Sequence, residues 1–415
     1  MPPRAIPGQL GIATPFEELV GRSETEMNAE FADYAKLGVD WLRTDFRWHY
    51  AQPDGAGGYT WAPFEKLVDA AVRYDIKVVA ILHDPPDWIG DRGGMNSPAN
   101  VDAFGKFAEA AAVRFKGKVQ HWEIGNEQNL YNSQSLPDVA AYTQSLKSAY
   151  RAIKSVDPQS IVISGGLSPV PKSSGGNVSA VEFLQKMYAS GAGAYFDALG
   201  YHPYSWPLQP DDPASWNGWK MMKLAIRETM VENGDAAKQI WITEMGAPTK
   251  GGAKAVSEQA QAYMLQKAAD LAHSYSWAGP LMWYSYKDRG GDRRDTENWF
   301  GLIRPDGTHK PIYKVFQDIA KHETADPSAH PIPPRKPKYS PVGDTGELNL
   351  RDGGTVIACS HVQQFVTESA WVLEGRDLVP RRGKDSGATC IQGIASAGPL
   401  DPVAFDPAAI GDPGS

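Results

Sequence analysis

Two glutamates end apolar, strand-like runs and form the most informative acidic pair in the sequence. Glu127 ends the run VQHWEIGNE, and Glu244 ends the run QIWITE. Two carboxyl groups that converge on one sugar can divide the work of breaking a glycosidic bond. One protonates the departing oxygen while the other attacks or stabilises the anomeric carbon. We therefore predict that Glu127 and Glu244 are the catalytic pair.

Further polar and aromatic residues stand at or just after the ends of similar runs. They suit a sugar substrate, because sugar hydroxyls need hydrogen-bond partners and the apolar face of a sugar ring stacks on aromatic side chains. The predicted substrate-binding residues are Asn126, Arg43, His83, His202, Tyr204, Trp283 and Trp88.

Three of these residues also have a structural interpretation. Arg43 could form an ion pair with Asp40 or Asp45, which share its run. His83 and His202 fit substrate contacts better than metal ligands, but each could also be a histidine whose hydrogen bonds are satisfied within the fold. The sequence leaves these alternatives open.

Glu123 shares a run with Glu127 at even spacing, so both side chains could point to the same side of a strand. We interpret Glu123 as a buried bracing group paired with a base. Trp88, Trp206 and Trp299 lie in segments that follow three of the runs, where each is either a sugar platform or loop packing.

Eight strand-like runs alternate with longer amphipathic segments and must position these residues. Their near-continuous apolar character is typical of parallel strands buried on both faces. Eight such units predict an α/β fold, a (β/α)8 TIM barrel, in which the carboxyl ends of all strands meet at one mouth. An open doubly wound sheet is the rival, but the first run carries no G-x-G-x-x-G turn. The runs span residues 9–14, 39–46, 76–83, 119–127, 160–166, 198–204, 239–244 and 280–286.

One amphipathic segment carries clear helix boundary signals. Ser23 and Glu26 match a capping box at its start, and Gly38 is placed to end it. These signals predict a helix between the first two strands.

The sequence divides into three regions. We predict a barrel over residues 1–322, a Pro-rich linker over 323–345 and a small, irregular or β-rich C-terminal extension over 346–415. Because the extension is too short for a large core, a disulfide between Cys359 and Cys390 would help to stabilise it.

Composition excludes several classes of protein. The 415 residues include 41 Lys and Arg against 49 Asp and Glu, a net charge of −8, which disfavours binding to nucleic acid or anionic membranes. No apolar run reaches the roughly 20 residues of a membrane span.

No signal peptide is visible, and the sequence lacks a P-loop, an H-E-x-x-H motif and a G-x-S-x-G elbow. Two catalytic carboxylates need no cofactor or metal.

Several short motifs at the strand ends resemble those of clan A retaining glycoside hydrolases. HWEIGNEQN resembles the Asn-Glu signature after the fourth strand, and WITEMG resembles the nucleophile strand, the seventh. The resemblance is greatest to family 39 and its bacterial exopolysaccharide-cleaving relatives, and it covers residues 8–322. It also rests on DPPDW, HPYS and MWYS, which follow or lie on strands three, six and eight.

The resemblance implies a role for each matching residue. Glu127 would be the acid/base of a double displacement and Glu244 the nucleophile, with Arg43 and Tyr204 bonded to Glu244. Asn126 would bind the sugar 2-hydroxyl. In addition, the resemblance implies that Trp283 forms the floor under the sugar. This sequence departs from the family's common Asn-Glu-Pro-Asn pattern at Gln128, which stands where many relatives have a proline.

The leading hypothesis is a retaining, endo-acting glycoside hydrolase of a cell-surface or matrix polysaccharide, located outside the cell or in the cell envelope. An exo-acting β-xylosidase-like enzyme is the close alternative. A second class is a non-catalytic glycan-binding or structural protein, such as a phage tail component in the virion that docks to a partner through residues 323–415. The sequence leaves the sugar, the linkage and the oligomeric state open.

Overall fold

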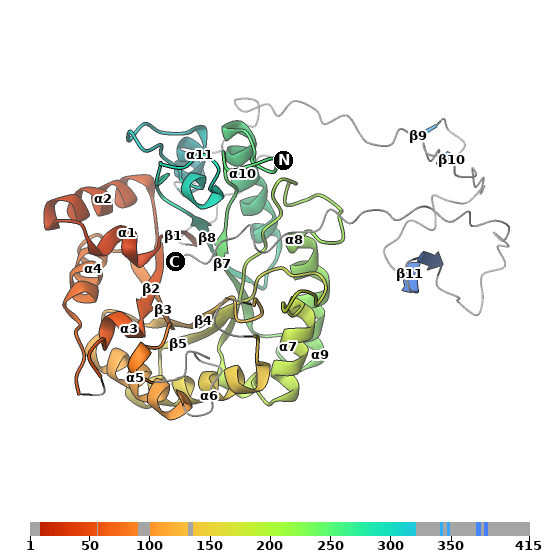
Figure 1. The fold of residues 1–415 in the computed structure, drawn as a ribbon. Coiled ribbons are helices and arrows are strands. Elements are labelled where there is room, and N and C mark those ends of the chain that lie inside the picture. Colours follow the sequence, from red (N-terminus) through yellow and green to blue (C-terminus); the bar gives the residue numbers. More distant parts are fainter. Residues whose placement is uncertain are drawn as a thin grey trace. The chain divides into compact units, whose positions relative to one another are not determined.

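The computed structural model describes residues 9–55, 57–89, 100–131 and 136–320, together with four short strands beyond them. Eight parallel strands close into one barrel, in which β1 pairs with both β2 and β8 (Figure 1). The predicted (β/α)8 fold is therefore confirmed, and closure excludes the open sheet. The strands are β1 Leu10–Ala13, β2 Trp41–Arg47, β3 Lys77–His83, β4 His121–Asn126, β5 Ile161–Gly166, β6 Ala198–Tyr201, β7 Gln239–Met245 and β8 Ala278–Tyr284.

Every predicted run overlaps one of these strands, with ends that agree within a few residues. The largest difference is at β6, which ends at Tyr201 rather than at Tyr204. Pro203 has no backbone N–H to donate to a neighbouring strand, so the ladder does not extend through it.

Helices surround the barrel in the order expected for repeated strand–helix units (Figure 1). The predicted capping box is present: the Ser23 hydroxyl accepts from the Glu26 N–H, and Glu26 accepts from the Ser23 N–H. Gly38 follows in the left-handed conformation, with φ +87°. The helices are α1 Phe16–Val20, α2 Glu24–Leu37, α3 Trp48–Ala51, α4 Ala62–Arg73, α5 Val101–Arg114, α6 Val139–Val156, α7 Ala180–Ala189, α8 Gly218–Met221, α9 Arg227–Glu232, α10 Glu258–Ser274 and α11 Pro311–Ala320.

The barrel interior changes from aromatic to polar along its axis. Near the amino ends of the strands, Trp41 makes edge-to-face contacts with His121 and Trp241 at ring distances of 4.7 and 5.1 Å. Two residues further along the same strands stand Arg43, Glu123 and Thr243, all buried. The aromatic layer closes the bottom of the barrel and leaves a charged layer directly beneath its mouth.

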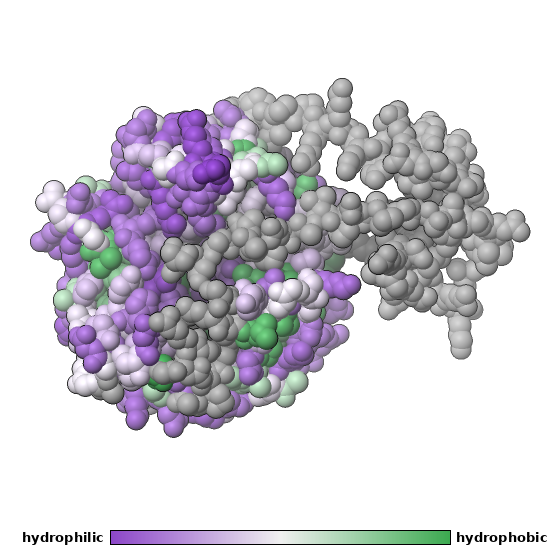
Figure 2. Space-filling view, in the orientation of Figure 1, coloured by the Kyte–Doolittle hydropathy of each residue, from purple (hydrophilic) through white to green (hydrophobic). Residues whose placement is uncertain are grey.

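The face of the barrel seen in Figure 2 carries mainly hydrophilic residues, with small hydrophobic groups between them. Among the described residues, no helix combines the length and apolar character that a membrane span requires.

A second unit covers residues 333–405. Its described parts are two antiparallel pairs, β9 Pro341–Val342 with β10 Glu347–Leu348, and β11 Trp371–Glu374 with β12 Asp377–Pro380. Apart from β9, the predicted linker lies outside the described residues, as does the predicted Cys359–Cys390 disulfide, so the proposed domain boundaries stay predictions.

Candidate active site

The turn after β4 places Glu127 at the barrel mouth in an unusual backbone conformation. Gly125 and Glu127 both have positive φ values, +83° and +48°, although only glycine adopts this region at no cost. The Glu127 N–H donates to the carbonyl of Gly166 on β5, at 2.9 Å. Holding a non-glycine residue there costs about 1–3 kcal/mol, a strain that is commonly found at functional sites.

A bulge in β7 brings two consecutive side chains to the interior. The register between β7 and β8 shifts between Ile242 and Met245, which allows Thr243 and Glu244 to escape strict alternation. Thr243 is fully buried and bonds across the barrel to Glu123. Glu244 lies one residue nearer the mouth and keeps 13% of its side chain exposed.

Arg43, on β2, joins polar groups of β4 and β7. Its Nε lies 2.6 Å from Glu123, its Nη1 lies 2.8 Å from Glu244, and its Nη2 lies 2.7 Å from the Asn126 side-chain oxygen. Arg43 therefore pairs with the two glutamates rather than with Asp40 or Asp45 alone. Glu123 is fully buried and paired with this base, which confirms its interpretation as a bracing group.

Tyr204 and His202, both from the segment after β6, contact the two predicted catalytic carboxyls. The Tyr204 hydroxyl donates to Oε1 of Glu244. Nδ1 of His202 lies 2.9 Å from Oε1 of Glu127, and its Nε2 lies 3.2 Å from the hydroxyl of Thr243. Because its ring is fully buried and both nitrogens are engaged, His202 supports Glu127 rather than contacting substrate as predicted.

His83 is likewise held by carboxylates instead of being presented to a ligand. Its Nε2 lies 2.8 Å from Asp45 and its Nδ1 lies 3.2 Å from Asp84, which also pairs with Arg47. Burial alone would lower the pKa of His83, but the charge of Asp84 and the hydrogen bonds to both aspartates raise that pKa to about 9. The predicted substrate contact is therefore replaced by a buried, cationic brace between β2 and β3.

This brace predicts a pH-dependent contribution to stability. A histidine whose pKa is raised from 6.5 to about 9 stabilises the fold fully below pH 6.5, and this stabilisation is lost as pH rises through 9. The raised pKa corresponds to about 3 kcal/mol. Urea unfolding of the parent and of His83→Gln at pH 6 and pH 9.5 should show the difference in stability between them shrinking by about that amount. A difference that stays constant over this range would contradict the prediction.

Trp283 does not form the predicted sugar floor. Parallel register places Trp283 beside Ile12, and it places Tyr284 beside Ala13, whose other neighbour is Arg43. Successive residues of a strand point to opposite faces, so Tyr284 shares the interior side with Arg43, whereas Trp283 points outward. The Trp283 ring is fully buried, and its N–H donates to the Phe300 carbonyl.

Tyr284 is consequently the β8 aromatic residue beside Glu244. Burial raises the pKa of its hydroxyl, and the charges of Glu297 and Glu244 raise it further, so both carboxyls lie nearby. The Tyr284 hydroxyl donates to Glu297 at 2.9 Å and accepts from Arg289 at 3.3 Å.

The loop tryptophans differ in what they leave exposed. Trp206 and Trp299 are buried, which favours the packing interpretation for both. Trp88 is partly exposed, donates its N–H to the Gln52 carbonyl at 2.7 Å and packs edge-on against Trp48.

Sequence reasoning missed three residues that the structure places in the site: Thr243, Gly166 and Tyr284. Strand alternation could have identified Tyr284, because it is adjacent to Trp283 and the two must point to opposite faces. Thr243 was hidden because strict alternation counted back from Glu244 would turn it outward; it lies inward with Trp241, two residues earlier, and the bulge lets Glu244 face inward as well. Gly166 had no signal beyond its position at a strand end.

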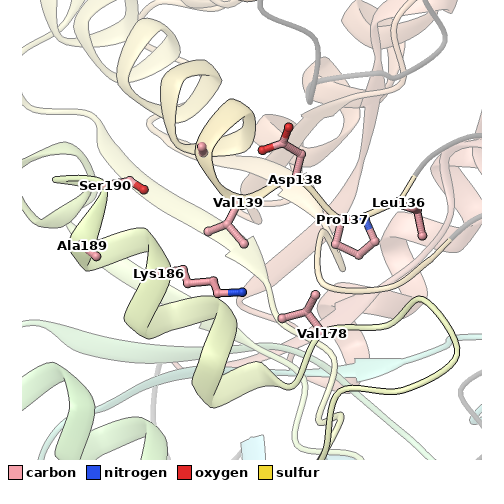
Figure 3. A pocket seen from close by; sticks show the side chains of 9 residues that line it. Leu136, Pro137, Asp138, Val139, Val178, Lys186, Ala189 and Ser190 are labelled. Carbon is pink, nitrogen blue, oxygen red and sulfur yellow. The ribbon is translucent and has the colours of Figure 1, made fainter.

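A separate surface pocket lies between the start of α6 and helix α7 (Figure 3). Its lining includes Asp138, Val139 and Lys186 but neither catalytic candidate, so it is not part of this site. Within the described part of the chain, no group of three or more His, Cys, Asp or Glu side chains is arranged to hold a metal ion.

Comparisons with known proteins agree with a carbohydrate-active barrel. The family model described as cellulase, glycosyl hydrolase family 5, matches residues 9–285. Cytosolic beta-glucosidase of Homo sapiens is 26% identical over 106 residues, which are 24% of this chain and 23% of the human protein. The chain thus aligns with about a quarter of that relative's length.

Two solved structures share the fold at low sequence identity. A family 39 glycoside hydrolase from Bacteroides cellulosilyticus WH2 has a TM-score of 0.60 at 19% identity, covering 76% of this chain and 63% of its own. A monomeric beta-xylosidase from Caulobacter crescentus CB15 has a TM-score of 0.59 at 19% identity, covering 76% and 69%. The chain belongs to the cellulase family, glycosyl hydrolase family 5, and thereby to the clan A glycoside hydrolases.

Proposed function

We propose that the protein is a retaining glycosidase that works by double displacement, with Glu127 as acid/base and Glu244 as nucleophile. The observation that carries the proposal is that both glutamates lie at the strand ends and are linked to each other by hydrogen bonds through buried side chains. Both keep a small exposed fraction, 11% for Glu127 and 13% for Glu244, while the groups between them are buried. This arrangement fits a carboxyl pair that reaches substrate but is held from behind.

The contacts around Glu244 suit a nucleophile. Arg43 and Tyr204 donate hydrogen bonds to different oxygens of its carboxylate, and both stabilise the charged form. Glu244 would attack the anomeric carbon while Glu127 protonates the leaving oxygen. Water, deprotonated by Glu127, would then release the sugar from Glu244.

Two further residues would bind the sugar at the cleavage point. The Asn126 oxygen accepts from Arg43, so the amide is oriented with its Nδ2 as the donor for the 2-hydroxyl. Tyr284 would take the place proposed for Trp283 and support the sugar ring through its aromatic face.

We propose further that the substrate is a β-linked polysaccharide of a cell surface or matrix, cleaved internally, and that the enzyme acts outside the cell or in its envelope. The partly accessible Trp88, after β3, is suited to bind a sugar unit away from the cleaved bond. The particular resemblance to family 39 stays a prediction. Exo action like that of a β-xylosidase stays the alternative to endo action, and product lengths would separate the two.

The test is incubation with a panel of bacterial and plant polysaccharides, scored for reducing ends and product length. The parent should release sugar, Glu244→Gln should not, and Glu232→Gln, an exposed glutamate on α9, should match the parent. Mixed long products would indicate endo action, and monomers or dimers alone would indicate exo action. Equal release by Glu244→Gln and the parent would refute the proposed function.

A further inference from the structure

A continuous series of hydrogen bonds connects the two candidate catalytic carboxyls inside the barrel. Its steps measure 2.9, 3.2, 3.0, 2.6 and 2.8 Å. The four groups between the ends are at most 3% exposed, so each depends on its neighbours for hydrogen bonds. In order, the series is Glu127, His202, Thr243, Glu123, Arg43 and Glu244.

The direction of each bond in the series can be fixed from the Glu123 end. Arg43 can only donate, and the Gly166 N–H donates as well, so Glu123 is an acceptor surrounded by donors. The Thr243 hydroxyl lies 3.0 Å from the same carboxylate. The Thr243 hydroxyl must therefore donate its single hydrogen to Glu123.

The assignment of Thr243 then determines the histidine. With its hydrogen on Glu123, the Thr243 oxygen can only accept, so the neighbouring Nε2 of His202 must carry a hydrogen. In a neutral ring, Nδ1 is then an unprotonated acceptor. The 2.9 Å contact between Nδ1 and Oε1 of Glu127 needs one hydrogen between the two atoms.

The contact between His202 and Thr243 depends on glycine at position 166. A Cβ atom at position 166 would lie 2.1 Å from Nε2 of His202 and 2.8 Å from the Thr243 hydroxyl oxygen. Glycine at 166 thus permits His202 and Thr243 to meet, and its own N–H and carbonyl bond Glu123 and Glu127.

We propose that Thr243 and His202 are positioning residues that hold one proton between His202 and Glu127 in the resting enzyme, as the proton delivered to the leaving oxygen. The inference rests on the proposed function, because it assigns a use to the proton. The inference also explains why a proton is held at Glu127: Thr243, on β7, fixes the hydrogen of His202 on Nε2, and Nδ1 is left to face Glu127.

The arrangement serves both halves of the reaction. In the first, the proton moves to the leaving oxygen as the glycosidic bond breaks and an oxygen of Glu244 bonds to the anomeric carbon. The Glu127 carboxylate then faces the lone pair on Nδ1, a contact without a hydrogen that is unfavourable at 2.9 Å. In the second half, Glu127 removes a proton from water, the water oxygen bonds to the anomeric carbon, Glu244 departs, and the starting state returns.

The kinetic test compares Thr243→Val, which removes the hydroxyl at constant shape, with Thr243→Ser, which keeps it. The probes are 2,4-dinitrophenyl and phenyl β-cellobioside, because dinitrophenolate leaves without protonation whereas phenolate needs it. kcat/KM is used because it reports the first half-reaction alone. The ratio of kcat/KM values, dinitrophenyl over phenyl, should rise about tenfold in Thr243→Val and keep the parent's value in Thr243→Ser. An unchanged ratio in Thr243→Val would overturn the proposal, since a purely structural defect slows both substrates equally.

A second readout is independent of activity. The full chain is labelled with ¹⁵N-histidine, and the His202 ring signals are identified by their loss in His202→Asn. Nε2 should carry a directly bonded hydrogen in the parent; an Nε2 without one would overturn the inference. If the parent cleaved no glycoside, the proposed function would fail, while this spectrum would still decide whether Nε2 of His202 carries the hydrogen that the inference requires.

Discussion

Glu244→Ala is expected to lower hydrolysis by about 10³-fold or more, and sodium azide is expected to restore turnover with inversion at the anomeric carbon. Without the carboxylate, no covalent intermediate forms, but azide fits the space left on the same face of the sugar. From a β-glycoside the product would be the α-glycosyl azide. The measurement is the rate with and without azide, with the anomer of the product read by NMR.

Glu127→Ala is the matched comparison, because it removes a carboxyl from the opposite face. Here the nucleophile is intact, so azide would intercept the glycosyl-enzyme and give the β-glycosyl azide. An activated aryl glycoside should still react in its first step, since its leaving group needs no acid. If both variants gave the same azide anomer, the assignment of acid/base and nucleophile would be wrong.

Arg43→Met is expected to destabilise the protein by about 3–5 kcal/mol and to remove most activity. Arg43 is buried and is the base that faces both Glu123 and Glu244, at 2.6 and 2.8 Å. Its loss would leave Glu123, fully buried, as an uncompensated charge. The free energy of unfolding in urea and kcat/KM on the same preparation measure the two effects.

The double variant Arg43→Met, Glu123→Gln separates stability from catalysis. Removing the stranded charge should recover much of the lost stability, because a neutral amide costs less to bury than a carboxylate. Activity should stay low, since Glu244 would still lack its cation. If stability did not recover, the charge of Glu123 would not be the source of the loss.

The fold followed from the sequence because buried parallel strands are apolar on both faces and so stand out as continuous runs. Barrel topology then placed Arg43, Asn126 and Tyr204 at one mouth without any further information. The particular contacts of Arg43 and Tyr204 with Glu244 were implied by the resemblance to clan A glycoside hydrolases, and the structure contains both.

The errors arose where side-chain direction or long-range partners decide the outcome. Trp283 and Tyr284 are adjacent, and only the register with β1 shows which of them faces inward. His83 and His202 have the chemistry of sugar ligands, but aspartates in one case and Glu127 with Thr243 in the other occupy their nitrogens. The function of residues 323–415, including docking to a partner, remains a prediction from composition.

The most direct test of the central claim is the anomeric configuration of the sugar at the moment of its release. A β-linked substrate that the parent cleaves is followed by ¹H NMR in the first minutes, before the anomers equilibrate. Double displacement at Glu244 with Glu127 as acid/base predicts that the β anomer appears first. An α anomer appearing first would mean direct attack by water, and it would contradict a covalent role for Glu244.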